Sequence, residues 1–183
     1  MRFYNTEIET DLKGIYQEKN CVTVMQAIEI LKTMEMPFND YTVAKALQNV
    51  RSLTHFRGRW EILNQKPLTI ADTGHNAHGL NLVIQQLKRE KYNKLHIVFG
   101  MVKDKDLKPV IELLPKDATY YFCQANLPRA LESETLKQEC KLLGLNGEAY
   151  SSVIAAYQAA QKNSSQHDLI FIGGSTFVVA EVL

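Results

Sequence analysis

An acidic, an imidazole and an amide side chain follow directly on the short apolar run 68–71. They are Asp72, His75 and Asn76, with Gly74 between the acid and the imidazole. Glycine gives such a turn conformational freedom, and Asn76 can cap a following helix, whose first N–H groups and positive dipole end favour negative charge. The stretch therefore predicts a site for phosphate, with a metal ion or polar substrate beside it, although Gly-rich polar turns are also common in α/β proteins in general.

Two further polar turns and an arginine pair accompany this stretch. Gly100 leads from an apolar run into the lysines and aspartates of 103–106, and the segment 173–176 reads Gly-Gly-Ser-Thr. Paired glycines let backbone amides approach a ligand, and the two hydroxyls can bind it or cap a helix. Arg57 and Arg59 suit bidentate recognition of phosphate or carboxylate. Each feature also has a simpler interpretation as a solvated loop.

Alternating apolar runs and amphipathic stretches indicate the elements that position these turns. The runs 95–99 and 169–172 are almost continuously apolar, which is typical of strands buried on both faces. We therefore expect an α/β fold, a Rossmann-like three-layer domain with a mostly parallel sheet, whose working residues lie beyond the carboxyl ends of the strands. The expected strands are 60–63, 68–72, 95–99, 118–123, 168–172 and a short one at 148–150, and the expected helices are 76–89, 107–114, 133–143, 152–161 and one from 175 onward.

The first 55 residues follow a different pattern. A helical period of apolar residues predicts a helix over 22–34, capped by Asn20 or Thr23, and a second helix from Asp40 or Thr42 to about Asn49. Two short helices bury too little surface for an independent domain, so 1–55 is predicted to be a fragment of a different domain from 56–183. The buried face of the second helix is expected to comprise Val43, Ala46, Leu47 and Val50.

Composition restricts the class of protein. The chain has 183 residues, 45% of them hydrophobic, and its 21 basic residues nearly balance its 20 acidic ones. We therefore expect one good hydrophobic core. The near balance of charges predicts no nucleic-acid partner. No apolar run resembles a membrane span or a signal peptide, so we also expect no membrane partner and a cytoplasmic location. Cys21, Cys123 and Cys140 are widely spaced, which predicts buried thiols and neither a disulfide framework nor a metal site.

Four ordered motifs within 56–183 resemble a known family. They are Gly58-Arg59-Trp60-Glu61, Asp72-Thr73-Gly74-His75-Asn76, the segment from Phe99 to Asp106, and Gly174-Ser175. Together they resemble the C-terminal domain of folylpolyglutamate synthase, often a bifunctional dihydrofolate synthase, in the Mur ligase superfamily. The family usually has D-G-A-H-N-P where this chain has Asp72 to Ala77, a difference that keeps the acid, imidazole and amide. Upstream, Gln17 to Asn20 is similar to the end of that family's central ATPase domain, which makes 1–55 its expected remnant, with a hinge near 53–59.

The resemblance implies an ATP-dependent amide ligase that joins L-glutamate to a folate or to dihydropteroate, with ATP and magnesium as cofactors. It implies no catalytic residue in this chain. Binding roles carry over to matched positions only: ATP to Asn20, Arg59, Asp72 and His75, and glutamate to Lys103, Asp106 and Ser175.

No G-x-x-x-x-G-K-[ST] phosphate-binding loop occurs in the chain. We therefore expect the chain to be inactive alone and to need the remainder of a ligase chain, which would bind most of the ATP and magnesium. The alternative is a noncatalytic Rossmann-like module that binds a nucleotide or an amino acid. A nicotinamide dehydrogenase is disfavoured, because no G-x-G-x-x-G follows the first strand. The sequence does not distinguish dihydrofolate synthase from folylpolyglutamate synthase activity.

Overall fold

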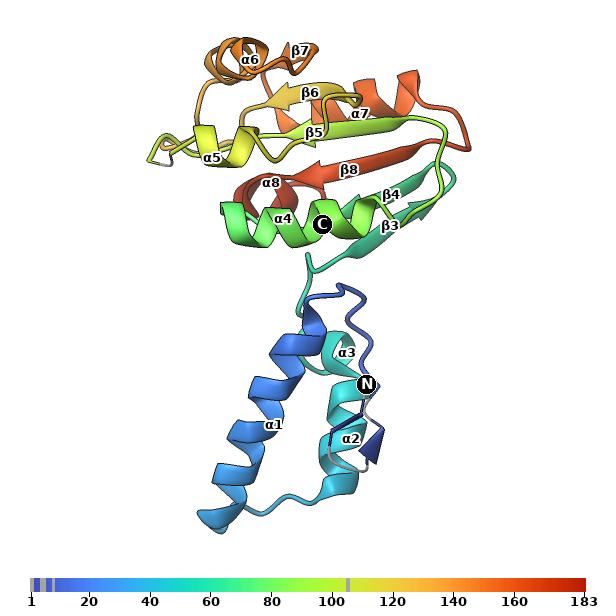
Figure 1. The fold of residues 1–183 in the computed structure, drawn as a ribbon, viewed down its shortest axis with the longest axis vertical. Helices are drawn as coiled ribbons and strands as arrows, with labels where there is room; N and C mark the ends of the chain where they lie inside the picture. The colour runs from blue at the N-terminus through green and yellow to red at the C-terminus, as the bar shows by residue number, and fades with distance from the viewer. Residues whose placement is uncertain (1, 4–5, 8, 105) are drawn as a thin grey trace. The chain divides into compact units, whose positions relative to one another are not determined.

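A six-stranded sheet organises the larger of two compact units in the computed structural model, which describes residues 2–3, 6–7, 9–104 and 106–183. The units are Met1–Arg57 and Gly58–Leu183. In the larger unit the strand order is β3-β4-β8-β5-β6-β7, and only β3 runs antiparallel to its neighbour (Figure 1). The strands are β3 (Glu61–Gln65), β4 (Leu68–Ala71), β5 (Leu95–Phe99), β6 (Thr119–Cys123), β7 (Gly147–Tyr150) and β8 (Leu169–Gly173). The predicted mostly parallel α/β sheet is confirmed.

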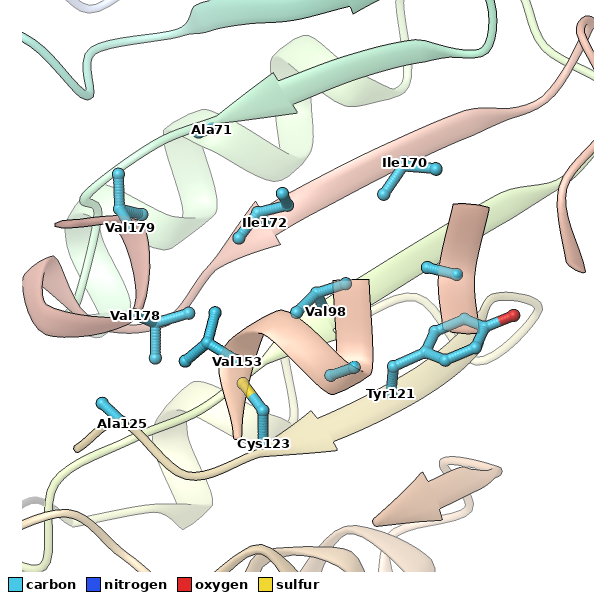
Figure 2. Packing of buried hydrophobic residues seen from close by; sticks show 12 residues of the cluster. Ala71, Val98, Tyr121, Cys123, Ala125, Val153, Ile170, Ile172, Val178 and Val179 are labelled. Atoms are coloured by element: carbon cyan, nitrogen blue, oxygen red, sulfur yellow. The ribbon is translucent and has the colours of Figure 1, made fainter. Parts of the chain in front are cut away.

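Five helices connect or follow these strands. They are α4 (Ala77–Leu87), α5 (Lys108–Ile111), α6 (Ser133–Leu142), α7 (Val153–Asn163) and α8 (Thr176–Ala180). Figure 2 shows the cluster in which α7 and α8 pack on one face of the sheet, with Val98, Ile172 and Val153 among its fully buried members. Neighbouring strand residues point to opposite faces, so the equally buried Ile97 and Phe122 show that the second face is covered as well.

The turns after β4, β8 and β5 lie side by side, because these three strands are consecutive in the sheet. Hydrogen bonds extend the ladder beyond the strands: the Asp72 N–H donates to Ile172 O at 3.1 Å, and the Gly100 N–H donates to Gly173 O at 3.4 Å. Gly174 has a φ of +92°, and a Cβ there would lie 2.5 Å from Phe99 Cε2. Glycine is therefore required where the β8 turn passes the end of β5.

The smaller unit is thinly packed. It contains the antiparallel strands β1 (Arg2–Phe3) and β2 (Thr6–Glu7) and the helices α1 (Gln17–Thr33), α2 (Asp40–Gln48) and α3 (Val50–Thr54). Of the face predicted for α2 only Leu47 is buried, and Ala46 is exposed. Val24 and Leu31 of α1 are also exposed, and so is Met34 directly after this helix, at 66%. The described part of this unit therefore buries little apolar surface.

The start and the cap predicted for the first helix were wrong. The first helix begins at Gln17, so Asn20 lies within it and cannot be its cap, and Thr23 lies deeper still. The helix α3 overlaps only the first two residues of the hinge predicted near 53–59, and that hinge stays a prediction. The start of α2 at Asp40 is as predicted, and Asn39 caps it by accepting a hydrogen bond from the Thr42 N–H.

A buried polar cluster lies near the amino ends of β5 and β8. His96 Nδ1 is 3.0 Å from the Tyr121 hydroxyl, and His96 Nε2 is 3.4 Å from Asp168 Oδ2. Burial raises the pKa of the Asp168 carboxyl, but hydrogen bonds from Ser165 and the neighbouring His96 outweigh this effect, so the pKa lies below its usual value. The cluster lies at the edge of the sheet opposite the polar turns.

All three cysteines are free and buried, as predicted. Burial raises the pKa of the Cys140 thiol to about 12 and raises that of Cys123 as well. Among the described helices, none combines the length and the apolar character that crossing a bilayer would require.

Candidate functional site

The Asp72 carboxylate organises the first turn. It is 2% exposed, and its two oxygens accept hydrogen bonds from the N–H groups of Trp60 and Gly74, each at 2.8 Å. Asn76 then caps α4 by accepting a hydrogen bond from the Gly79 N–H at 2.8 Å, which confirms its predicted role. Asp72 thus joins the segment before β3 to the turn after β4 and holds both in place.

His75 projects from this turn as an exposed side chain. Its Nδ1 lies 3.1 Å from the Thr73 carbonyl oxygen. A carbonyl can only accept, so this hydrogen bond requires the proton on Nδ1 and leaves the Nε2 lone pair of the neutral ring available. The Thr73 hydroxyl oxygen is buried and has no hydrogen-bond partner among the described residues.

Arg59 lies on a loop that is tied to the same turn. The Thr73 N–H donates to Gly58 O at 3.0 Å, and the Gly58 N–H donates to the buried Glu61 carboxylate at 2.7 Å. Gly58 and Trp60 both have positive φ values, +74° and +46°. The Gly-Arg-Trp-Glu motif is therefore a tight loop whose backbone positions Arg59 next to the turn that carries His75.

A cavity of about 110 Å³ lies at the carboxyl ends of the strands. This volume is well below the roughly 300–1,000 Å³ of pockets that enclose a whole small-molecule ligand, so it suits one polar group of a larger ligand. His75 and Ser175, predicted from separate motifs, both line it. The complete lining is His75, Val102, Arg129, Gly174, Ser175, Thr176 and Phe177.

Ser175 is 5% exposed and is the N-cap of α8, where its hydroxyl oxygen accepts a hydrogen bond from the Phe177 N–H at 3.2 Å. The predicted cap is therefore confirmed. The two other residues predicted to bind glutamate, Lys103 and Asp106, are exposed and do not belong to the cavity lining. Lys103 nevertheless lies beside it, because its N–H donates to Arg129 O at 2.9 Å.

Arg129 is the lining residue that sequence reasoning missed. It lies on the turn after β6, and its guanidinium carbon is 5.2 Å from the centre of the Phe177 ring. The segment carries no glycine pair or charge cluster to mark it. The available signal was positional: Pro128-Arg129 follows a predicted strand and therefore belongs to the same edge of the sheet as the other turns.

Asn20 belongs to the smaller unit. It lies in the first turn of α1, is exposed, and donates from Nδ2 to Gln17 Oε1 at 2.8 Å. The spacing of three residues places both side chains on one face of the helix.

Comparison with known proteins identifies the larger unit. Residues 58–176 match the family model described as Mur ligase, glutamate ligase domain. The dihydrofolate synthase/folylpolyglutamate synthase of Escherichia coli (strain K12) is 30% identical over 128 residues, which are 69% of this chain and 29% of that protein. This chain covers only 20%, 33% and 29% of the length of three curated relatives, so it spans less than half of each of those proteins.

Solved structures agree with this relationship. The folylpolyglutamate synthase/dihydrofolate synthase of Yersinia pestis, complexed with AMPPNP and Mn, has a TM-score of 0.70 and 25% identity over 85% of this chain and 36% of that one. The Mycobacterium tuberculosis folylpolyglutamate synthase, complexed with ADP and AMPPCP, has the same fold, with a TM-score of 0.80 and 21% identity over 97% of this chain and 41% of that one. The chain therefore belongs to the Mur ligase family, through a glutamate ligase domain at residues 58–176.

Proposed function

We propose that this chain supplies part of an ATP-dependent amide ligase that adds L-glutamate to a folate or to dihydropteroate. The observation that carries the proposal is the cavity in which His75 and Ser175 meet at the carboxyl ends of β4 and β8. All its lining residues except Phe177 lie within the matched glutamate ligase domain, and the matched relatives are named for the synthesis of dihydrofolate or folylpolyglutamate.

In this proposal, the cavity receives the amino acid. Ser175 offers a hydroxyl donor, and Lys103 stands beside the cavity with its cationic side chain exposed. Asp106 follows on the same turn. The resemblance assigns His75 to ATP, but its place in the cavity leads us to propose a contact with glutamate instead. The amine of glutamate must lose a proton when it forms an amide, and His75 Nε2 can accept a hydrogen bond from that ammonium group. These residues therefore orient the amine and the charged groups of glutamate.

Nucleotide contacts are proposed for the loop that carries Arg59 and for the turn beside it. Arg59 is suited to phosphate oxygens because its guanidinium can donate two parallel hydrogen bonds. Asp72 contributes by fixing the turn between Arg59 and His75, since its oxygens already accept two backbone N–H groups. Asn20 remains a predicted contact for the adenine side of ATP. The related Yersinia pestis and Mycobacterium tuberculosis structures contain AMPPNP and ADP.

The described residues do not fit a magnesium site of their own. Among them, no three His, Cys, Asp or Glu side chains gather as metal ligands. Magnesium neutralises phosphate charge where it is bound, and we propose that a P-loop ATPase domain outside this chain holds it. The exposed apolar residues of α1 and the thin core of residues 1–57 support the proposal that the smaller unit is a remnant of that domain.

The test uses the complete enzyme, meaning the polypeptide or complex that joins this chain to a P-loop ATPase domain. Glutamate-dependent ATP hydrolysis is measured with dihydropteroate and with tetrahydrofolate as acceptors. Arg59→Ala and His75→Ala should each lower turnover by at least tenfold, the loss of one charge-assisted hydrogen bond. Their matched controls are Arg89→Ala and His78→Ala, which change exposed residues outside the cavity lining.

Unchanged turnover in both site variants would refute the assigned roles. The 183-residue chain by itself should show no glutamate-dependent ATP hydrolysis, because it contains no P-loop motif. Hydrolysis by that chain would show that it completes the reaction alone.

A noncatalytic binding module is the second candidate, and the missing P-loop favours it. Calorimetric titration of the chain with ADP or L-glutamate would then show binding, whereas no assembly containing the chain would form an amide bond. Amide formation by the complete enzyme excludes this candidate.

A further inference from the structure

We propose that the Asp168 carboxylate is an acid-released latch, which holds the connection between α7 and β8 closed on the start of β5. The connection comprises residues 164–168 and lies at the edge of the sheet opposite the cavity. The latch is closed while the carboxylate carries its charge, and it opens when the carboxylate gains a proton. This conformational device does not depend on the proposed function.

Both oxygens of the carboxylate hold the connection in place. Asp168 Oδ1 accepts a hydrogen bond from the Lys94 N–H at 3.1 Å, and Asp168 Oδ2 accepts one from the Ser165 N–H at 2.7 Å. The next residue, Leu169, donates its N–H to Lys94 O at 2.9 Å, so the pairing of β8 with β5 begins beside the latch. Hydrogen bonds to a charged carboxylate are roughly twice as strong as those to a neutral group, so protonation weakens both bonds of the latch.

The buried side of the carboxylate adds only a weak contact. His96 Nε2 is 3.4 Å from Asp168 Oδ2, too far for a strong hydrogen bond, and the other ring nitrogen is 3.0 Å from the Tyr121 hydroxyl. Burial raises the pKa of this hydroxyl, and a hydrogen bond from Asn163 opposes the effect only in part, so Tyr121 keeps its proton in acid. The Tyr150 ring stacks on Tyr121, with 5.9 Å between the ring centres. Asp168 is therefore the carboxyl group of this cluster, and its own charge decides whether the connection is held.

The other side of the carboxylate lines a groove of about 630 Å³, through which protons reach it. The pKa of the Asp168 carboxyl lies below its usual value, because hydrogen bonds from Ser165 and the neighbouring His96 outweigh the effect of burial. A carboxyl with a lowered folded-state pKa stabilises the closed connection at neutral pH, and this stabilisation is lost as pH falls below about 4. The other ionisable side chains that line the groove are Lys66, Glu90, Lys91, Tyr92 and His167.

Hydrogen exchange of backbone amides, followed by NMR on the 183-residue chain, tests the latch. Protection factors, which correct for the intrinsic effect of pH on exchange, are measured between about pH 6 and about pH 3. The Lys94 and Ser165 amides report on the latch, and the amides of Ile97 and Phe171, in the middle of β5 and β8, report on the sheet. The first two protection factors should fall by about tenfold or more over this range, whereas the other two change little.

Three variants assign the acid response to one group. Asp168→Asn removes the charge with little change of shape, so protection of the Lys94 and Ser165 amides should already be low at about pH 6 and should not fall further in acid. Asp117→Asn is the matched control, because Asp117 is an exposed aspartate shortly before the neighbouring strand β6. His167→Gln removes the other ionisable side chain of the connection. Both of these variants should keep the wild-type response.

The wild-type series decides the inference even if Asp168→Asn does not fold. Unchanged protection of the Lys94 and Ser165 amides at about pH 3 would overturn it. A simultaneous loss at Ile97 and Phe171 would also overturn it, because the sheet would then unfold as a whole. A wild-type response that persists in folded Asp168→Asn would assign the release to another group and overturn the role of Asp168.

Discussion

Replacement of Gly174 by alanine tests the packing that shapes the cavity. The residue has a φ of +92°, and an added Cβ would lie 2.5 Å from Phe99 Cε2 and 2.7 Å from Gly100 O. The positive φ costs an L residue about 1–2 kcal/mol, and the forced shift of a packed ring and backbone costs about 1–3 kcal/mol more. We therefore expect Gly174→Ala to lower the free energy of unfolding by about 2–5 kcal/mol.

Gly144→Ala provides the matched control. Gly144 has a similar φ of +83°, but the nearest atom to its added Cβ is Lys116 Nζ at 3.9 Å. Only the backbone strain remains there, so the expected loss is about 1–2 kcal/mol. The difference between the two variants measures the steric contribution at Gly174.

Trp60 fluorescence during urea unfolding is a suitable assay. Trp60 is the single tryptophan of the chain and is 4% exposed in the larger unit, so its emission reports on that unit. A Gly174→Ala variant that is already unfolded without urea would agree with the upper end of the range. Equal losses for both glycine variants would refute the proposed close approach of the β8 turn to β5.

Three further outcomes can be checked on the same chain. The Asp168 carboxyl has a folded-state pKa below its usual value, so it stabilises the fold at neutral pH and that stability is lost as pH falls below about 4; Asp168→Asn should flatten the acid limb of a urea-unfolding series. Burial should keep the thiols of Cys123 and Cys140 unreactive toward a disulfide reagent at about pH 8 until urea is added, so that at most one of the three cysteines is labelled in the folded chain. Asn76→Ala should cost about 1 kcal/mol by removing the α4 cap, whereas no change in the unfolding midpoint would contradict that role.

Local sequence patterns were sufficient to predict the strands and helices of the larger unit. Continuous apolar runs predicted β5 and β8, since strands buried on both faces have no polar side to present. Asn76 and Ser175 were recognisable as caps because a cap depends on residues within one turn. The same local reasoning placed the start of α1 too late, because the polar first turn from Gln17 carries no apolar period.

The cavity could be anticipated only in part. Its glycines and hydroxyls stand next to predicted strands, so their arrival at one edge of the sheet followed from parallel topology. The assignment of glutamate contacts to Lys103 and Asp106 depended on motif resemblance, and neither belongs to the lining. Arg129 could not be singled out, because its proximity to Ser175 depends on contacts between turns that are distant in the chain.

The sequence by itself determined the alternation of strands and helices, the glycine-bearing turns and the family relationship, because periodicity, capping and ordered motifs are local properties. Only the tertiary structure decided which turns meet. β8, the last strand in the chain, inserts between β4 and β5, and this order brings Ser175 to His75 and sets Arg129 over Phe177. Strand order depends on the packing of the whole sheet, so no segment of the sequence contains that information alone.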